Sequence, residues 1–207
     1  MNPEEALELL DWKRRVFELY AYVREASPPD GWRAWRDERD HLFGSHPQTP
    51  LADPDAFEGV DYYDYDPSVR VLGEIAPAPE QELRLPVSRD EEIVAARVGR
   101  VTFELQGRES SLDVFWIGGY GGGVFLPFRD ATSGNRTYGA GRYLYDTVKG
   151  ADLGTEDGKL VLDFNFAYNP SCAYDPRWAC PLAPPANLLE QAVEAGERTP
   201  QQGSEGD

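Results

Sequence analysis

The sequence has little positive charge, and lysine is its scarcest charged residue. Lys13, Lys149 and Lys159 are the only lysines among 20 basic residues, against 37 acidic ones, and the net charge is −17. Such a surface repels nucleic-acid phosphate, which argues against a DNA- or RNA-binding role. Acidic excess with few lysines also favours a halophilic protein, because concentrated salt screens the self-repulsion; an ordinary acidic cytoplasmic protein is the alternative.

Long hydrophobic runs are also lacking. No stretch approaches the roughly 18 apolar residues of a membrane-spanning helix, so no membrane association is expected. The opening stretch MNPEEALELLDWKRR is acidic where a signal peptide would be basic. A cytoplasmic location is therefore the expectation.

Histidine and cysteine are equally scarce, with two of each. A metal site commonly needs more ligands than His41, His46 and the cysteines offer together, so no metal or cofactor is expected. The string GGYGGG, residues 118–123, lacks the lysine and the following helix of a phosphate-binding loop, and indicates a strand connection. No G-x-S-x-G string marks a serine nucleophile.

Cys172 and Cys180 are eight residues apart, which matches neither redox nor zinc-ligand spacings. Three interpretations stay open. Buried free thiols are the default in a reducing cytoplasm, a disulfide or redox pair is the second, and a reactive thiol activated by Arg177 is the third.

The first 50 residues predict two amphipathic helices. Residues 2–25 have Asn2 as a cap, Pro3 in the first turn and Glu5 in the position of a capping box. A second helix is expected to be capped by Asp30 and to run through Phe43, ending at Gly44. Its apolar face consists of Trp32, Trp35, Leu42 and Phe43.

From about residue 69 the hydrophobic period changes to that of short strands. Seven or eight of these follow one another without helices, and QGRES, residues 106–110, indicates a hairpin turn. The expected fold class is α+β, with two N-terminal helices packed on a mostly antiparallel β-barrel or bent β-sandwich. The expected organisation is a helical region over 1–50, a β-rich domain over 51–189 with a proline- and cysteine-containing loop, and a polar tail over 190–207.

The segment from 163 to 185, DFNFAYNPSCAYDPRWACPLAPP, combines both cysteines with five prolines and several polar aromatic residues. Proline restricts the backbone, so this segment is expected to hold one shape outside helix and sheet. With the strand-like piece around Arg142 it predicts a pocket for an anionic small molecule, in which the guanidinium clamps the anion. An internal salt bridge from Arg142 to Asp163 or Asp130 is the alternative. The expected ligand-binding residues are Tyr138, Arg142, Tyr143, Asp163, Asn165, Tyr168, Asn169 and Tyr174, and the catalytic candidates are Cys172, Cys180 and Asp163.

Long strings in this region resemble the domain-of-unknown-function 1684 family. They are LPFRDATSGNRTYGAGRYLY, VLDFNFAYNPSCAYDPRWACPLAPPANLL and EAGE, with WRAWRDERDHLFGSHPQTPL and FEGVDYYDYDPSVRV upstream, so the resemblance covers about residues 8–197. The sequence has QTPL where the family pattern has Ser-Pro-Leu, and ANLL where it has a Glu-Asn-Arg-Leu type ending. The resemblance implies a shared shape around residues 128–187 and a soluble cytoplasmic protein, but no substrate and no activity.

Two other functions remain open. The same segment could only lock the fold, with the protein binding another protein through aromatic side chains expected to be exposed: Trp12, Trp32, Trp35, Tyr62, Tyr63 and Tyr65. Alternatively, the two cysteines could make it a thiol redox protein. Whether the protein is an enzyme, and its oligomeric state, are not predicted.

Overall fold

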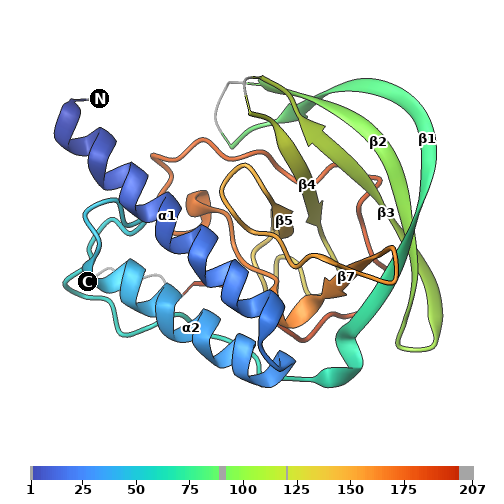
Figure 1. Ribbon diagram of the computed structural model, residues 1–207, viewed down its shortest axis with the longest axis horizontal. Helices are drawn as coiled ribbons and strands as arrows, with labels where there is room; N and C mark the ends of the chain where they lie inside the picture. Colours follow the sequence, from blue (N-terminus) through green and yellow to red (C-terminus); the bar gives the residue numbers. More distant parts are fainter. Residues whose placement is uncertain (1, 89–91, 120, 201–207) are drawn as a thin grey trace.

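Two helices lie side by side against a large curled antiparallel sheet (Figure 1). The computed structural model describes residues 2–88, 92–119 and 121–200. This arrangement confirms the predicted α+β class, since the sheet curls into a half-barrel and the helices cover one side of it.

Helix α1 spans Pro3–Glu25 and begins with the predicted capping box. The Asn2 side chain accepts a hydrogen bond from the Glu5 backbone at 2.9 Å, and the Glu5 carboxylate accepts one from the Asn2 backbone at 2.8 Å. These two bonds satisfy amide groups that a helix start otherwise leaves without partners.

Helix α2 spans Pro28–Ser45, so both predicted ends were wrong. Its N-cap is Ser27, and Asp30 lies inside the first turn, because the two prolines already fit the first helical positions. Gly44 keeps a helical backbone, and the helix ends at Ser45 because His46 precedes Pro47 and is extended, with φ −86° and ψ 136°. The predicted apolar face is confirmed, since all four of its side chains are buried.

Seven strands form one sheet in the order β5-β4-β3-β2-β1-β7-β6, with every neighbouring pair antiparallel. The strands are β1 Arg70–Pro86, β2 Glu92–Leu105, β3 Arg108–Ile117, β4 Gly123–Phe128, β5 Arg142–Asp146, β6 Thr155–Glu156 and β7 Lys159–Asp163. The predicted hairpin after β2 is confirmed, with positive φ at Gln106 and Gly107.

The sequence predicts four short strands here, at residues 69–75, 82–87, 92–98 and 100–107. Irregular pairing joins the first two into β1 and the last two into β2, so each observed strand is about twice as long as expected. The register shifts between Pro77 and Gln81 and between Arg97 and Gly99. Strand β7 pairs only with Arg70–Gly73, so the rest of β1 presents an edge on which proline removes no bond from a ladder.

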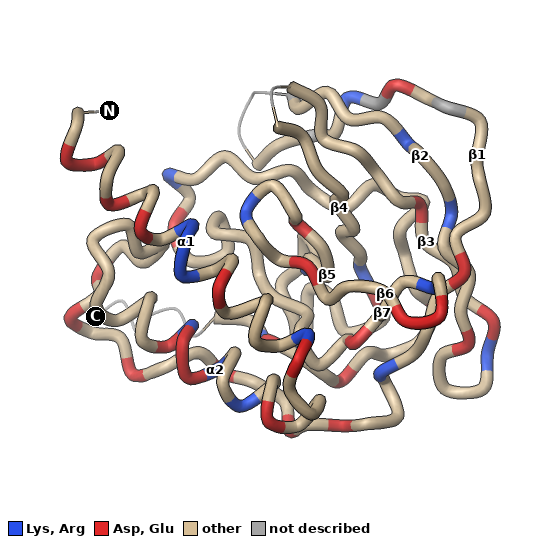
Figure 2. Tube along the Cα trace, viewed as in Figure 1, with Lys and Arg blue, Asp and Glu red and all other residues tan. Residues whose placement is uncertain are grey.

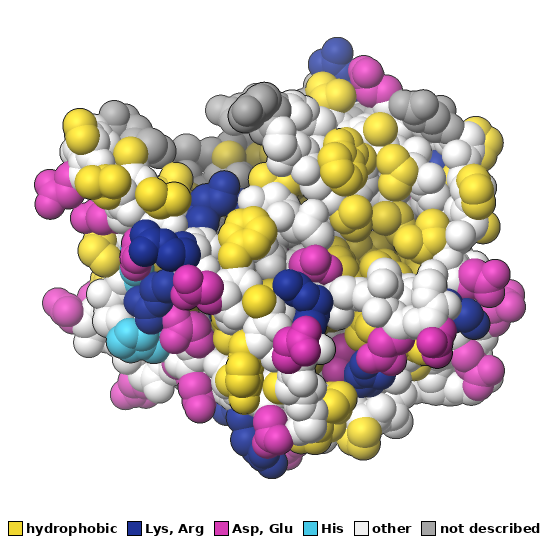
Figure 3. Space-filling model, in the orientation of Figure 1, with side chains coloured by type: hydrophobic (Ala, Val, Ile, Leu, Met, Phe, Trp, Pro, Cys, Tyr) yellow, Lys and Arg dark blue, Asp and Glu magenta, His cyan; other side chains and the backbone are white. Residues whose placement is uncertain are grey.

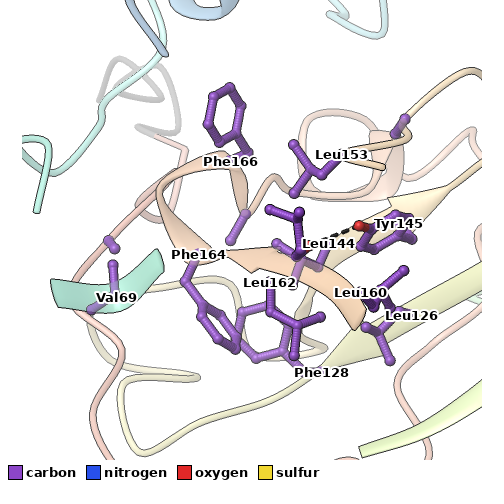
Figure 4. Packing of buried hydrophobic residues seen from close by; sticks show 14 of the residues in the cluster. Val69, Leu126, Phe128, Leu144, Tyr145, Leu153, Leu160, Leu162, Phe164 and Phe166 are labelled. Carbon is purple, nitrogen blue, oxygen red and sulfur yellow. Dashed lines mark hydrogen bonds between the residues drawn. The ribbon is translucent and has the colours of Figure 1, made fainter. Parts of the chain in front are cut away.

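The segment after β7 brings the two sides of the sheet together. The backbones of Tyr143 in β5 and Tyr168 exchange two hydrogen bonds, at 2.8 and 3.0 Å. Apolar side chains from both sides fill the interior, and Figure 4 shows Phe128, Leu144, Leu162 and Phe164 among them. Curling therefore encloses a core that a flat sheet of this composition would leave open.

The prediction of a polar tail over 190–207 was wrong for residues 190–200, the part that the structure describes. Val193, Ala195 and Glu197 are fully buried. The backbone of Gly196 accepts a bond from Tyr63, and that of Glu197 donates one to Ala167. Residues 190–200 thus belong to the packed fold, while 201–207 lie outside the described residues.

Candidate functional site

Arg142, the expected anion clamp, is enclosed inside the protein. Its side chain is 1% exposed and forms an ion pair with Asp130 at 2.9 Å. The other bonds of its terminal N–H groups go to the backbone carbonyls of Val193, Ala195 and Glu197. The four terminal N–H groups therefore have protein acceptors, and the guanidinium acts as a cross-link to the C-terminal segment, as in the salt-bridge alternative with Asp130.

Asp163 and Asn165, two of the expected ligand-binding residues, are buried and bonded to each other. Strand β7 ends at Asp163, and the chain turns into a 3-10 helix, η2 (Phe164–Phe166), in which the Asn165 amide donates to the Asp163 side chain at 3.1 Å. Asn165 holds both backbone polar groups of Asp66 at 2.8 Å. Burial raises the pKa of Asp163 to about 6, against hydrogen bonds from Asn165 and the charge of Arg70.

Tyr174 and Asn169 both bond to Glu197, which was not among the predicted site residues. The Tyr174 hydroxyl and the Asn169 backbone amide donate to its carboxylate at 2.8 and 2.6 Å, and Arg39 of α2 donates at 2.7 Å. Arg39 lies over the rings of Trp35, Phe43 and Tyr168. A buried ion pair thus joins α2 to the C-terminal segment.

A groove runs between the two helices and the junction of β5 with residues 168–171. It is partly open to solvent. Six of its 17 lining residues are aromatic, namely Trp12, Tyr20, Trp35, Phe43, Tyr143 and Tyr168. Three of the expected ligand-binding residues, Tyr143, Tyr168 and Asn169, line this groove, while Tyr138, Arg142, Asp163, Asn165 and Tyr174 do not.

Two residues that line the groove each have a buried oxygen with no hydrogen-bond partner within the described part of the chain, Oδ1 of Asp146 and Oδ1 of Asn169. Both residues are 3% exposed. Burial raises the pKa of Asp146, opposed mainly by Lys149, whose ammonium lies 3.8 Å from the other carboxylate oxygen. Buried acceptors are rarely left unpaired, so this wall is suited to a group that donates hydrogen bonds.

The two cysteines are free and buried beside each other. The backbone amide of Cys172 donates to the sulfur of Cys180 at 3.4 Å, and the Tyr138 hydroxyl lies 3.7 Å from the sulfur of Cys172. The hydroxyl of Tyr143 donates to the carbonyl of Pro181, directly after Cys180. Tyr143 thus lines the groove and bonds to the cysteine loop, while neither cysteine lines the groove.

The aromatic residues expected on the surface are mostly interior. Trp32, Trp35, Tyr62 and Tyr63 are at most 9% exposed, and Trp12 and Tyr65 are partly buried. The exposed large apolar side chains in the described part of the sheet include Ile75, Val94, Val98 and Trp116. Figure 3 shows apolar side chains gathered in a hollow on the sheet side of the molecule.

His46 has a structural role, whereas His41 is exposed on α2. His46 is buried, accepts a hydrogen bond from the Gln48 amide at 3.0 Å and packs edge-on against Trp12.

Among the described residues, no group of three or more His, Cys, Asp and Glu side chains is arranged to hold a metal ion. No helix in the described ranges is long and apolar enough to cross a membrane. Asp and Glu are spread along both helices and the loops (Figure 2).

The comparisons with known proteins support the resemblance read from the sequence. The profile of a family described as a protein of unknown function, DUF1684, matches residues 55–198. A solution NMR structure of an uncharacterized protein from Haloarcula marismortui is 37% identical, with a TM-score of 0.60, and the match covers 83% of this chain and 94% of that one. No protein with a curated description matches.

Proposed function

This chain belongs to the DUF1684 family, which has no assigned activity, and we propose from its own geometry that it binds a small molecule in the groove between the helices and β5. The observation that carries the proposal is the pair of unpartnered oxygens, on Asp146 and Asn169, in a wall of mainly aromatic and aliphatic side chains. Apolar walls with few placed polar groups are typical of ligand sites.

The rigidity of the wall supports the proposal. Tyr143 and Tyr168 are held by two mutual backbone bonds, and Trp35 Nε1 donates to the Tyr20 hydroxyl at 3.1 Å. Asn169 is fixed by its amide bond to Glu197 and by a side-chain bond to the Arg198 carbonyl at 2.7 Å. A preformed wall binds without spending free energy on ordering its side chains.

The ligand class follows from the charges at the groove. The expectation of an anion depended on Arg142, which lies elsewhere and is already bonded. Arg39, which does line the groove, is paired with Glu197. The unpaired groups are acceptors, so the ligand we propose has an apolar or aromatic body and an amino or hydroxyl group that donates to Asp146 and Asn169.

The other candidate functions have different support. The interaction module needed exposed aromatic residues, and four of the six named are packed inside. The cysteines do not line the groove, so a role for them can be tested separately from ligand binding there. Ligand binding is therefore the measurement that tests the groove proposal.

The experiment is an NMR titration of the ¹⁵N-labelled protein with two probes that differ in charge, tyramine and 4-hydroxyphenylacetate. Tyramine should shift resonances of residues lining the groove and bind at least about 10-fold more tightly, because its ammonium can donate to Asp146. Asp146→Asn should weaken tyramine by about 10-fold, the range for loss of one charged hydrogen bond.

A blocking variant separates the groove from the rest of the surface. Val16→Trp places a large ring in the groove wall and should abolish the shifts, while Leu7→Trp, at an exposed position of the same helix, should leave them unchanged. Equal binding of both probes, or binding that survives Val16→Trp, would contradict the proposal.

A further inference from the structure

The loop with both cysteines is held in place from several sides. Trp178 donates to the carbonyl of Pro50 at 3.0 Å, and Arg177 donates to that of Leu51 at 3.1 Å. Ser88 accepts from the Cys180 amide at 3.1 Å and donates its own amide to the Cys180 carbonyl at 3.0 Å. The two thiols therefore meet in a fixed geometry, although seven residues separate them in the chain.

The two sulfurs are chemically unequal. The pKa of Cys172 is lowered to about 6, chiefly by its hydrogen bond with the Cys180 thiol, with burial opposing and smaller contributions from Ser88 and Tyr138. The same bond and burial raise the pKa of Cys180. At neutral pH this favours a thiolate at Cys172 beside a protonated thiol at Cys180, an arrangement of attacking and resolving thiols.

Access to the pair is narrow. Cys172 is 9% exposed and Cys180 is 2% exposed. A bulky disulfide must approach a sulfur in line, whereas hydrogen peroxide is about the size of two water molecules. Burial thus selects for a small oxidant.

We propose that Cys172 and Cys180 form a peroxide-reactive pair, in which Cys172 attacks and Cys180 resolves. The Cys172 thiolate attacks one peroxide oxygen, the O–O bond breaks, and hydroxide leaves and takes up a proton, which gives a sulfenic acid and water. The Cys180 sulfur, losing its proton, then attacks the sulfur of Cys172, the S–O bond breaks, and a second water leaves. In total, two thiols and one hydrogen peroxide become one disulfide and two waters.

The test treats the reduced full-length protein with hydrogen peroxide, blocks the remaining thiols by alkylation and measures the intact mass. The wild type should lose the mass of two hydrogen atoms and accept no alkylation, as a monomer. Cys180→Ser should stop at a sulfenic acid that dimedone traps on residue 172, and Cys172→Ser should not react with dimedone.

Two further measurements separate a reactive pair from packed thiols. Tyr138→Phe removes a hydroxyl from the Cys172 sulfur and should lower its alkylation rate at neutral pH severalfold, with the melting temperature unchanged. Oxidised glutathione should leave the wild type reduced over the same time. The proposal is overturned if peroxide leaves both wild-type thiols open to alkylation, or if the product is a disulfide-linked dimer.

Discussion

The carboxylate of Glu197 lies 2.5 Å from the guanidinium of Arg39, and the two residues are separated by 158 positions in the chain. Glu197 is fully buried, and Arg39 is 14% exposed. The pair links α2, Tyr174 and the segment that begins the groove wall at Asn169. It is therefore the contact through which helices, groove and C-terminal segment support one another.

Glu197→Gln should lower the free energy of unfolding by about 3 kcal/mol, because it leaves the Arg39 charge buried without its counter-ion. Urea titration followed by circular dichroism measures the change. Glu194→Gln is the matched control, since Glu194 is 50% exposed and its pair with Arg136 should contribute less than about 1 kcal/mol. Equal effects of the two substitutions would refute the role assigned to Glu197.

Arg142→Met should destabilise the protein by about 3–5 kcal/mol, because it leaves Asp130 as an unpaired buried charge and removes donors from three carbonyls. Arg136→Met changes an arginine that is 48% exposed and should cost less than about 1 kcal/mol. Tyramine binding to an Arg142 variant that still folds should be unchanged. A selective loss of ligand binding with normal stability would return Arg142 to the ligand site.

Gly196→Ala should destabilise more than Gly107→Ala, although the two glycines have nearly the same φ, +72° and +73°. A left-handed backbone costs alanine about 1–2 kcal/mol at either site. At Gly196 the new Cβ would also lie 2.3 Å from the Ala167 carbonyl oxygen, whereas at Gly107 nothing lies within 4 Å. Thermal unfolding compares the two variants, and similar melting temperatures would mean that the C-terminal segment is not tightly packed.

Asp163→Asn should gain stability relative to the wild type as the pH rises from 4 to 7. Burial raises the folded pKa of Asp163 from 3.8 to about 6, so the folded state binds this proton more tightly than the unfolded chain. Its contribution thus favours folding at low pH and is lost as the pH rises through 6, by at most about 3 kcal/mol. Urea titrations across this range measure the difference.

The same charge change at exposed Asp64 controls for the net charge in that comparison. If the wild type and Asp163→Asn keep a constant difference in unfolding free energy at every pH, Asp163 does not bind its proton more tightly in the folded state.

Potassium chloride should raise the melting temperature steeply between low and molar concentrations, because a net charge of −17 is then screened. An uncharged osmolyte at equal osmolality is the control for exclusion from the surface. Equal stabilisation by both solutes would argue against charge screening and against the interpretation of the composition as halophilic.

Local patterns in the sequence predicted much of the fold. The capping box at Asn2 and the period of the apolar residues placed both helices and their buried faces, because these signals depend on neighbours within a turn. Alternation and turn residues located the strands from β1 to β4. The joining of predicted strands was missed because a bulge lets a strand continue past a proline or glycine.

Local sequence patterns predicted only one wall of the candidate site. Tyr143, Tyr168 and Asn169 were expected in a pocket and do line the groove, but the groove's other wall comes from the helices, more than 90 residues away in the chain. Asp146, which has the unpaired carboxylate oxygen, is the last residue of β5 and belongs to no motif. Its role depends on what packs beside it.

The sequence by itself determined the two helices, the strand-rich remainder and the stiff cysteine loop, because apolar period, caps and prolines act locally. Only the tertiary structure decided what Arg142 and Glu197 do. Arg142 bonds chiefly to backbone carbonyls of residues 193–197, and every residue has a carbonyl, so no side-chain pattern marks the partner. The polar composition of residues 190–200 resembles that of a solvated tail. Backbone carbonyls of this segment instead accept hydrogen bonds from the buried Arg142 side chain. That pairing arises only when the sheet curls.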